Sequence, residues 1–97
     1  MPHYALQPFL KVPRAGFKKV SLTIIVPAYN EAANIADTIR SLQNQIIPAD
    51  EILVVDDFST DNTGDVARSC GVTVIRPPKN TGSKAGAQNF ALQFIAT

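Results

Sequence analysis

The chain has little of several residue types that small proteins use for cross-links or for catalysis. Its 97 residues include one cysteine, one histidine and no tryptophan. The lone Cys70 excludes an internal disulfide and a cysteine-based zinc site, which fits a reducing cytoplasm. Because Cys70 precedes Gly71 at a predicted helix end, it is interpreted as a small buried apolar residue. His3, the single histidine, lies in a segment without a packing pattern.

Long hydrophobic runs are also absent. No stretch approaches the roughly 20 apolar residues that cross a bilayer. No apolar segment of about seven or more residues follows the N-terminal charges, as a secretory signal would require. The sequence therefore predicts a cytoplasmic chain. Any contact of a full-length parent with the inner face of the membrane would be made through residues beyond this sequence.

Positive charge is concentrated near the N-terminus. Residues 1–20 hold four basic residues and no acid, whereas residues 21–97 hold five basic and eight acidic residues. A basic segment can bind an anionic membrane surface, but here prolines interrupt it and its apolar residues fit no period. Residues 1–19 are predicted to be a solvated, poorly ordered leader, of which residues 1 to about 17 pack little. Residues 20–97 form the predicted domain, and no nucleic-acid partner is expected.

The rest of the chain alternates between β-branched runs and helical patterns. Strands are predicted near residues 20–26, 51–55 and 72–76, and helices over residues 35–46 and 63–69 and from Ser83 onward. Strands that alternate with helices are parallel and are joined by right-handed crossovers. The predicted fold class is α/β, a Rossmann-like three-layer parallel sheet in the order β-α-β-α-β-α.

Polar residues follow each predicted strand. The three segments are Pro27–Glu31, Asp56–Asp61 and Lys79–Lys84. In a parallel sheet the carboxyl ends of the strands lie on one edge, and ligands bind in the crevice outside that edge. We therefore expect these three loops to line one groove.

The paired acids after the second predicted strand are candidates for binding a nucleoside. A carboxylate accepts but cannot donate, so it suits the N3–H of uracil and mismatches the N3 acceptor of cytosine. Asp57 is predicted to face the ligand, and Asp56 to hold the loop. The alternative is that one acid caps a turn, because the segment DDFSTDNT is rich in turn-forming residues.

The other two loops offer a ring and a cation. Tyr29 can lie beside a flat base while Pro27 fixes the backbone, although a tyrosine that only packs over the strand end is the simpler alternative. In the segment NTGSKAG, backbone N–H groups at a helix start and Lys84 can meet phosphate oxygens. A solvated Lys84 is an equally good interpretation, since the segment matches neither G-x-G-x-x-G nor a Walker motif.

Taken together, these motifs resemble the nucleotide-binding half of family 2 inverting glycosyltransferases, which have the GT-A fold. The segments VPAYNE, VVDDFSTDNT and NTGSKAGAQN follow the family order and spacing over residues 20–97. The resemblance implies that the first two loops bind the uridine of a nucleotide sugar. The residues that inherit this role are Pro27, Tyr29, Glu31, Asp56 and Asp57. The KAG sequence at Lys84 is similar to that of processive polysaccharide synthases, which favours a membrane-bound parent.

Other family features are expected only C-terminal to Thr97. The D-x-D motif that holds a divalent metal, Mn²⁺ or Mg²⁺, is absent from this chain, as are the catalytic base and the acceptor site. The hypothesis is therefore the truncated donor half of an enzyme that transfers a sugar, with inversion, from a UDP-sugar to a saccharide or lipid acceptor. A catalytically silent nucleotide-binding module or partner subunit is the alternative. A dinucleotide-binding Rossmann domain is disfavoured because VPAYNE lacks the required glycines.

Overall fold

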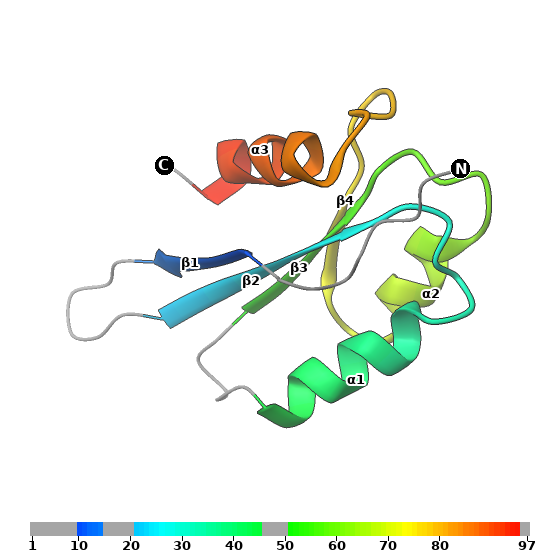
Figure 1. Cartoon of the computed structure of the whole chain (residues 1–97). Coiled ribbons are helices and arrows are strands. Elements are labelled where there is room, and N and C mark those ends of the chain that lie inside the picture. Colours follow the sequence, from blue (N-terminus) through cyan, green and yellow to red (C-terminus); the bar gives the residue numbers. More distant parts are fainter. Residues whose placement is uncertain (1–9, 15–20, 46–50, 96–97) are drawn as a thin grey trace.

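A computed structural model describes residues 10–14, 21–45 and 51–95. The described elements are β1 (Leu10–Arg14), β2 (Ser21–Ala28), α1 (Ile35–Gln45), β3 (Glu51–Asp56), α2 (Thr63–Ser69), β4 (Thr73–Ile75) and α3 (Lys84–Ile95). They form one four-stranded sheet in the order β1-β2-β3-β4 with helices on both faces (Figure 1). The predicted order of three strands and three helices from residue 20 onward is confirmed.

The three predicted strands are parallel. In β2 and β3, Ile24 lies opposite Ile52 and Ala28 lies opposite Asp56. In β3 and β4, Val54 lies opposite Val74. β2 continues through Pro27 to Ala28, two residues beyond its predicted end. β1 pairs with β2 only as far as Ile25, so Pro27 lies where β2 has one described strand neighbour, and a proline is tolerated at such an edge position.

The fourth strand was not predicted. Leu10–Arg14 forms β1 and pairs antiparallel with β2, from Leu10 opposite Ile25 to Arg14 opposite Ser21. The expectation that residues 1 to about 17 pack little is therefore wrong for this segment. Pro13 argued against a strand, but β1 is an edge strand, where one side of the backbone needs no partner. Residues 1–9 and 15–20 of the predicted leader lie outside the described residues.

Two hydrophobic clusters lie on the two faces of the sheet, because successive strand residues point to opposite faces. Ile24, Val26 and Val54 belong to the cluster that α1 and α2 cover, and the half-buried Cys70 packs against it, in agreement with the sequence interpretation. Ile25 and Val55 belong to the cluster under α3. Figure 1 shows α3 on one side of the sheet and both other helices on the opposite side.

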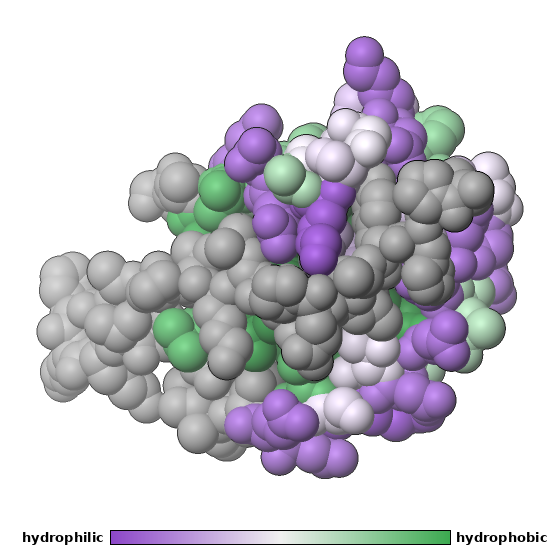
Figure 2. Space-filling model, viewed as in Figure 1, coloured by the Kyte–Doolittle hydropathy of each residue, from purple (hydrophilic) through white to green (hydrophobic). Residues whose placement is uncertain are grey.

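The helices differ in which of their residues are buried. Every third or fourth residue of α1 is buried, namely Ile35, Ile39 and Leu42, as the amphipathic pattern predicts. Hydrophilic residues cover the outer side of α1 in Figure 2. α3 buries only Ala87 and Ala91 fully. Among the described residues, no helix is long and apolar enough to cross a membrane.

Candidate functional site

Three loops meet at the carboxyl ends of the parallel strands, as predicted. We call residues 29–34 the first loop, residues 57–62 the second loop and residues 76–83 the third loop. Their mutual contacts are mainly between side chains of one loop and backbone groups of another. Since a backbone N–H that is buried without a partner costs free energy, these contacts determine the shape of the sheet edge.

Asn30 joins the first loop to the second. Its side-chain oxygen accepts hydrogen bonds from the backbone N–H of Thr60, at 2.8 Å, and of Asp61, at 3.3 Å. Its own N–H donates to the Ser59 hydroxyl at 2.9 Å. The backbone of Asn30 has φ of 52°, a left-handed conformation that asparagine tolerates better than most residues. Asn30 is therefore suited to this position in both its side chain and its backbone.

Asp61 makes a second link between these loops. Its carboxylate accepts from the backbone N–H of Ala32 at 3.2 Å and from the backbone N–H of Thr63 at 3.0 Å. The Thr63 hydroxyl donates to it as well. Burial by itself raises the pKa of Asp61, but these hydrogen bonds outweigh burial and lower the pKa below its usual value. The acid therefore stays ionised and holds the start of α2 near the first loop.

Asp57 joins the second loop to the third. The side chain is fully buried, and its carboxylate accepts from the Thr81 N–H at 2.8 Å and the Thr81 hydroxyl at 2.6 Å. Its carbonyl accepts from the Asn80 side-chain amide at 2.8 Å. Gly86 allows this arrangement, because a Cβ there would lie 2.9 Å from the Thr81 carbonyl oxygen.

Asp56 faces the other side of the sheet. Its Oδ2 accepts from Nη1 of Arg76 at 2.8 Å, and its Oδ1 accepts from the Ser59 N–H at 3.0 Å. Gly64 in α2 leaves room for it, since a Cβ at Gly64 would lie 2.6 Å from Oδ2. Arg76 also donates to the Ser59 carbonyl at 3.1 Å and is the only one of these groups with substantial exposure, at 39%.

The observed contacts give both neighbouring acids a structural role: Asp56 holds the second loop through the Ser59 N–H, as predicted, and Asp57 binds Thr81 of the third loop. Successive residues at a strand end point to opposite faces, so Asp57 turns toward the α3 side and Asp56 toward the α2 side. Asp56 also lines a cavity, whereas Asp57 does not. A ligand-facing role of Asp57 stays a prediction.

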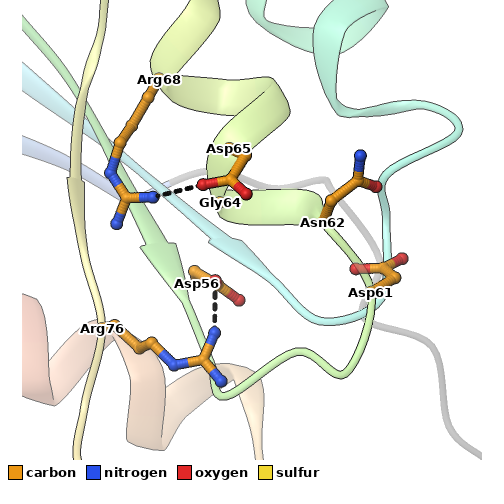
Figure 3. Close-up of a pocket in the computed structure, with 7 residues that line it drawn as sticks. All are labelled: Asp56, Asp61, Asn62, Gly64, Asp65, Arg68 and Arg76. Carbon is orange, nitrogen blue, oxygen red and sulfur yellow. Dashed lines mark hydrogen bonds and ion pairs between the residues drawn. The ribbon is translucent and has the colours of Figure 1, made fainter.

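The cavity has a volume of about 140 Å³ and lies between α2 and the end of β3 (Figure 3). Its walls combine acids with two guanidinium groups. The lining residues are Asp56, Asp61, Asn62, Gly64, Asp65, Arg68 and Arg76. Figure 3 shows Arg76 pointing to Asp56 from the side opposite α2. The cavity therefore presents hydrogen-bond donors and acceptors next to one another.

The other predicted site residues lie around this edge and do not line the cavity. Pro27 is fully buried at the end of β2. Tyr29 is half-buried in the first loop, and Glu31 is 3% exposed, with its N–H donating to the Thr63 hydroxyl at 2.9 Å. Lys84 is half-buried as the first residue of α3. A role of these four residues in nucleotide binding stays a prediction.

Three residues that organise the edge were missed from the sequence. Arg76 and Thr81 each bind one of the paired acids, and Asn30 bridges two loops. Arg76 directly follows the third parallel strand, so its position at the carboxyl edge was a usable signal. Nothing in the spacing of Thr81 indicates that it binds Asp57.

The family resemblance implies a divalent metal, held by a motif that is absent from this sequence. In residues 10–14, 21–45 and 51–95, no group of three or more histidine, cysteine, aspartate or glutamate side chains is placed to hold a metal ion. The acids described above accept hydrogen bonds from protein groups instead. The described residues thus do not fit a metal site by themselves.

Comparison with known proteins identifies relatives over most of the chain. The family described as glycosyl transferase family 2 matches residues 23–97. A 4,4'-diaponeurosporenoate glycosyltransferase of Staphylococcus aureus (strain USA300) is 41% identical over 75 residues, which are 77% of this chain and 20% of that protein. The same enzyme from the bovine strain RF122 / ET3-1 is 46% identical over 66 residues, 68% of this chain and 17% of that protein.

A solved structure has the same fold. It is the mannosyltransferase PcManGT from Pyrobaculum calidifontis in complex with GDP-Man and Mn²⁺, with a TM-score of 0.69 and 30% identity. The match covers 91% of this chain and 28% of that one. The chain thus spans about a fifth of the length of the curated relatives it matches. Since the family match extends over residues 23–97 and the fold agrees, the chain belongs to glycosyl transferase family 2.

Proposed function

We propose that this chain provides the donor-nucleotide site of an enzyme that transfers a sugar, with inversion, from a UDP-sugar to a lipid or saccharide acceptor. Family membership supports sugar transfer, and the relatives named above are glycosyltransferases. One of them was solved with a nucleotide sugar. The lone Cys70 fits the reducing cytoplasm, where we propose that the site works.

The Asp56–Arg76 pair at the wall of the cavity carries the proposal. A carboxylate has about four acceptor positions, of which two are used here by Arg76 and Ser59. A guanidinium has five N–H donors, and Arg76 uses Nη1 for Asp56 and Nη2 for Ser59. Asp56 therefore has further acceptor positions, and Arg76 further N–H donors, for a ligand in the cavity.

An acceptor next to a donor matches a base edge that presents a donor beside an acceptor. In the pose that places N3 of the ring opposite Asp56, uracil would donate its N3–H to Asp56 and accept from Arg76 through a carbonyl oxygen. In the same pose, cytosine would present its N3 acceptor to Asp56 and its N4 donor to Arg76, so both protein groups would face groups of the same kind. A buried polar group left without its partner costs about 1 to 3 kcal/mol, so we expect the site to reject cytosine.

Guanine shares this donor and acceptor pattern through N1–H and O6, and the mannosyltransferase was solved with GDP-Man. The cavity of about 140 Å³ is small, which favours the single ring of uracil over the double ring of guanine. We therefore propose UDP as the preferred nucleotide and GDP as its closest competitor.

The remaining predicted residues have proposed roles around the base. Tyr29 would lie beside the ring, with Pro27 and the buried Glu31 fixing the first loop. Lys84 and backbone N–H groups at the start of α3 would meet the diphosphate. The Staphylococcus aureus relatives act on 4,4'-diaponeurosporenoate, a carotenoid acid, which favours a lipid acceptor.

Calorimetric titration of the 97-residue chain with UDP, GDP and CDP tests the proposal. We expect UDP to bind about tenfold or more tightly than CDP, and Asp56→Asn to weaken UDP binding by roughly 10- to 100-fold, the equivalent of 1 to 3 kcal/mol. Asp37→Asn is the matched control, because Asp37 is an exposed acid on α1 that pairs only loosely with Arg40, at 3.7 Å. Equal affinity for UDP and CDP would rule out reading of the base by Asp56, and absence of binding to any nucleotide would rule out the donor site.

A further inference from the structure

Phe58 is in an unfavourable conformation next to the cavity. Its φ is 64°, and in the described part of the chain Asn30 is the only other non-glycine residue with positive φ. Left-handed backbone is uncommon for a bulky side chain and costs free energy. The side chain is also 42% exposed, so a large part of its apolar surface remains in water. Neither property is expected of a residue that only stabilises the fold.

The ring of Phe58 lies against the Arg76 guanidinium. The Arg76 guanidinium carbon lies 4.6 Å from the ring centroid, which is the geometry of a cation–π interaction. The tight turn after β3, in which the Phe58 N–H donates to the Asp56 carbonyl at 2.7 Å, places the ring there. A glycine at position 58 would adopt the same backbone without strain but would lack the ring.

Three contacts therefore restrain the Arg76 side chain. Two are the hydrogen bonds to Asp56 and Ser59, which hold its Nη atoms. The third is the Phe58 ring, over which the guanidinium carbon lies. Without the ring, an arginine that is 39% exposed could rotate into solvent and leave Asp56 as a buried charge without its cation.

We propose that Phe58 is a positioning residue for the nucleotide site. Its ring holds the Arg76 guanidinium in the orientation that keeps Asp56 paired and directs the remaining N–H groups to the base. The inference rests on the proposed function, because it assigns Phe58 to the same cavity. Strained backbone conformations cluster at functional sites, because a conformation that costs stability is retained where it helps to bind a ligand.

Three substitutions in the 97-residue chain separate positioning from stability. Phe58→Leu keeps an apolar side chain of similar size and the strained backbone but removes the aromatic face. Phe58→Tyr keeps the face, and Phe58→Gly removes both the face and the strain. UDP affinity is measured by calorimetry and the midpoint of thermal unfolding by circular dichroism. The orientation of Arg76 is measured by NMR from the ring-current shift of its guanidinium protons.

We expect Phe58→Leu to lose the ring-current shift and to weaken UDP binding about two- to fivefold, the size of an exposed cation–π contact. Phe58→Tyr should retain both properties. Phe58→Gly should bind UDP as weakly as Phe58→Leu while unfolding at the same or a higher temperature than Phe58→Leu, because it lacks the strained backbone. Phe94→Leu, which changes an exposed aromatic residue on α3, is the control and should leave UDP binding unchanged.

The outcomes distinguish the two proposals. If the wild type binds UDP and Phe58→Leu binds it equally well with the Arg76 shift intact, the role of Phe58 is wrong and the donor site stands. Weak binding by Phe58→Tyr would also contradict it, because the aromatic face would not be the property that matters. If the wild type binds no nucleotide, the donor site itself is wrong, and a persisting Arg76 shift would then report only the contact between Arg76 and the Phe58 ring.

Discussion

At the scale of single residues, the chain depends on polar groups buried at the sheet edge. Asp57 and Asp56 are 0% and 2% exposed, and each binds a group from a segment about 20 residues further along the chain. Hydrogen bonds to a charged group contribute about 1.5 to 3 kcal/mol, more than those between neutral groups. These acids therefore stabilise the third loop as well as shaping the site.

Replacing Asp57 with alanine tests this structural role. The change leaves the Thr81 N–H and hydroxyl without their acceptor, so we expect the free energy of unfolding to fall by about 2 to 3 kcal/mol. Urea unfolding followed by circular dichroism measures it. Asp37→Ala, which removes an exposed acid from α1, should change the same quantity by less than about 0.5 kcal/mol. Equal effects of the two substitutions would show that Asp57 does not hold the third loop.

At the scale of secondary-structure elements, β1 covers an edge that would otherwise be open. Its five residues pair with the first half of β2, on the side opposite β3. An exposed strand edge presents unpaired N–H and C=O groups and pairs readily with other chains. α3 packs on the face of the sheet opposite α1 and α2. A right-handed crossover after α3 would therefore place a further parallel strand at the edge of β2 that β1 occupies. β1 and such a strand would compete for β2.

Removing residues 1–14 should therefore promote self-association. Without β1, the edge of β2 from Ser21 to Ile25 loses its partner, and we expect concentration-dependent dimers or larger species. Sedimentation velocity over a range of concentrations measures this. Removing residues 1–9 keeps β1 and is the control, which should sediment like the intact chain. A truncated chain that stays monomeric at all concentrations would mean that β1 does not protect the edge.

At the scale of the whole molecule, the acids that end the parallel strands of the described residues are engaged with other protein groups. An inverting transfer requires a base placed at the acceptor hydroxyl, and its loss typically costs about 10² to 10⁴ in rate. The acids of the carboxyl edge are already engaged: Asp56 with Arg76, Asp57 with Thr81, and Asp61 with Thr63. We therefore expect none of these three to act as the base that takes a proton from an acceptor.

The 97 residues alone should therefore bind the donor without transferring its sugar. We expect no catalytic turnover of a UDP-sugar, with Mn²⁺ present and a lipid acceptor supplied, in an assay for released UDP. The same preparation should still bind UDP in calorimetry, which controls for a misfolded sample. Repeated, metal-dependent release of UDP would show that acids described here as structural take part in catalysis.

Much of the architecture follows from the sequence alone. The β-branched runs and the three- and four-residue apolar spacing of Ile35, Ile39 and Leu42 determine three parallel strands and their helices, because periodicity and burial are local properties. Gly71, with φ of 84°, ends α2 where the sequence placed a left-handed cap. The edge at which the three loops meet also follows, since the carboxyl ends of parallel strands must lie together.

Only the tertiary structure decided which acid serves which purpose and which segment completes the sheet. Asp56 and Asp57 are neighbours in sequence, but their faces depend on the strand register, and their partners Arg76 and Thr81 come from a loop whose position no local pattern contains. β1 contains Pro13 and lacks a clear period, so it is a strand only because β2 offers an unpaired edge. Local patterns determine elements, whereas contacts between loops and at edges depend on how the elements assemble.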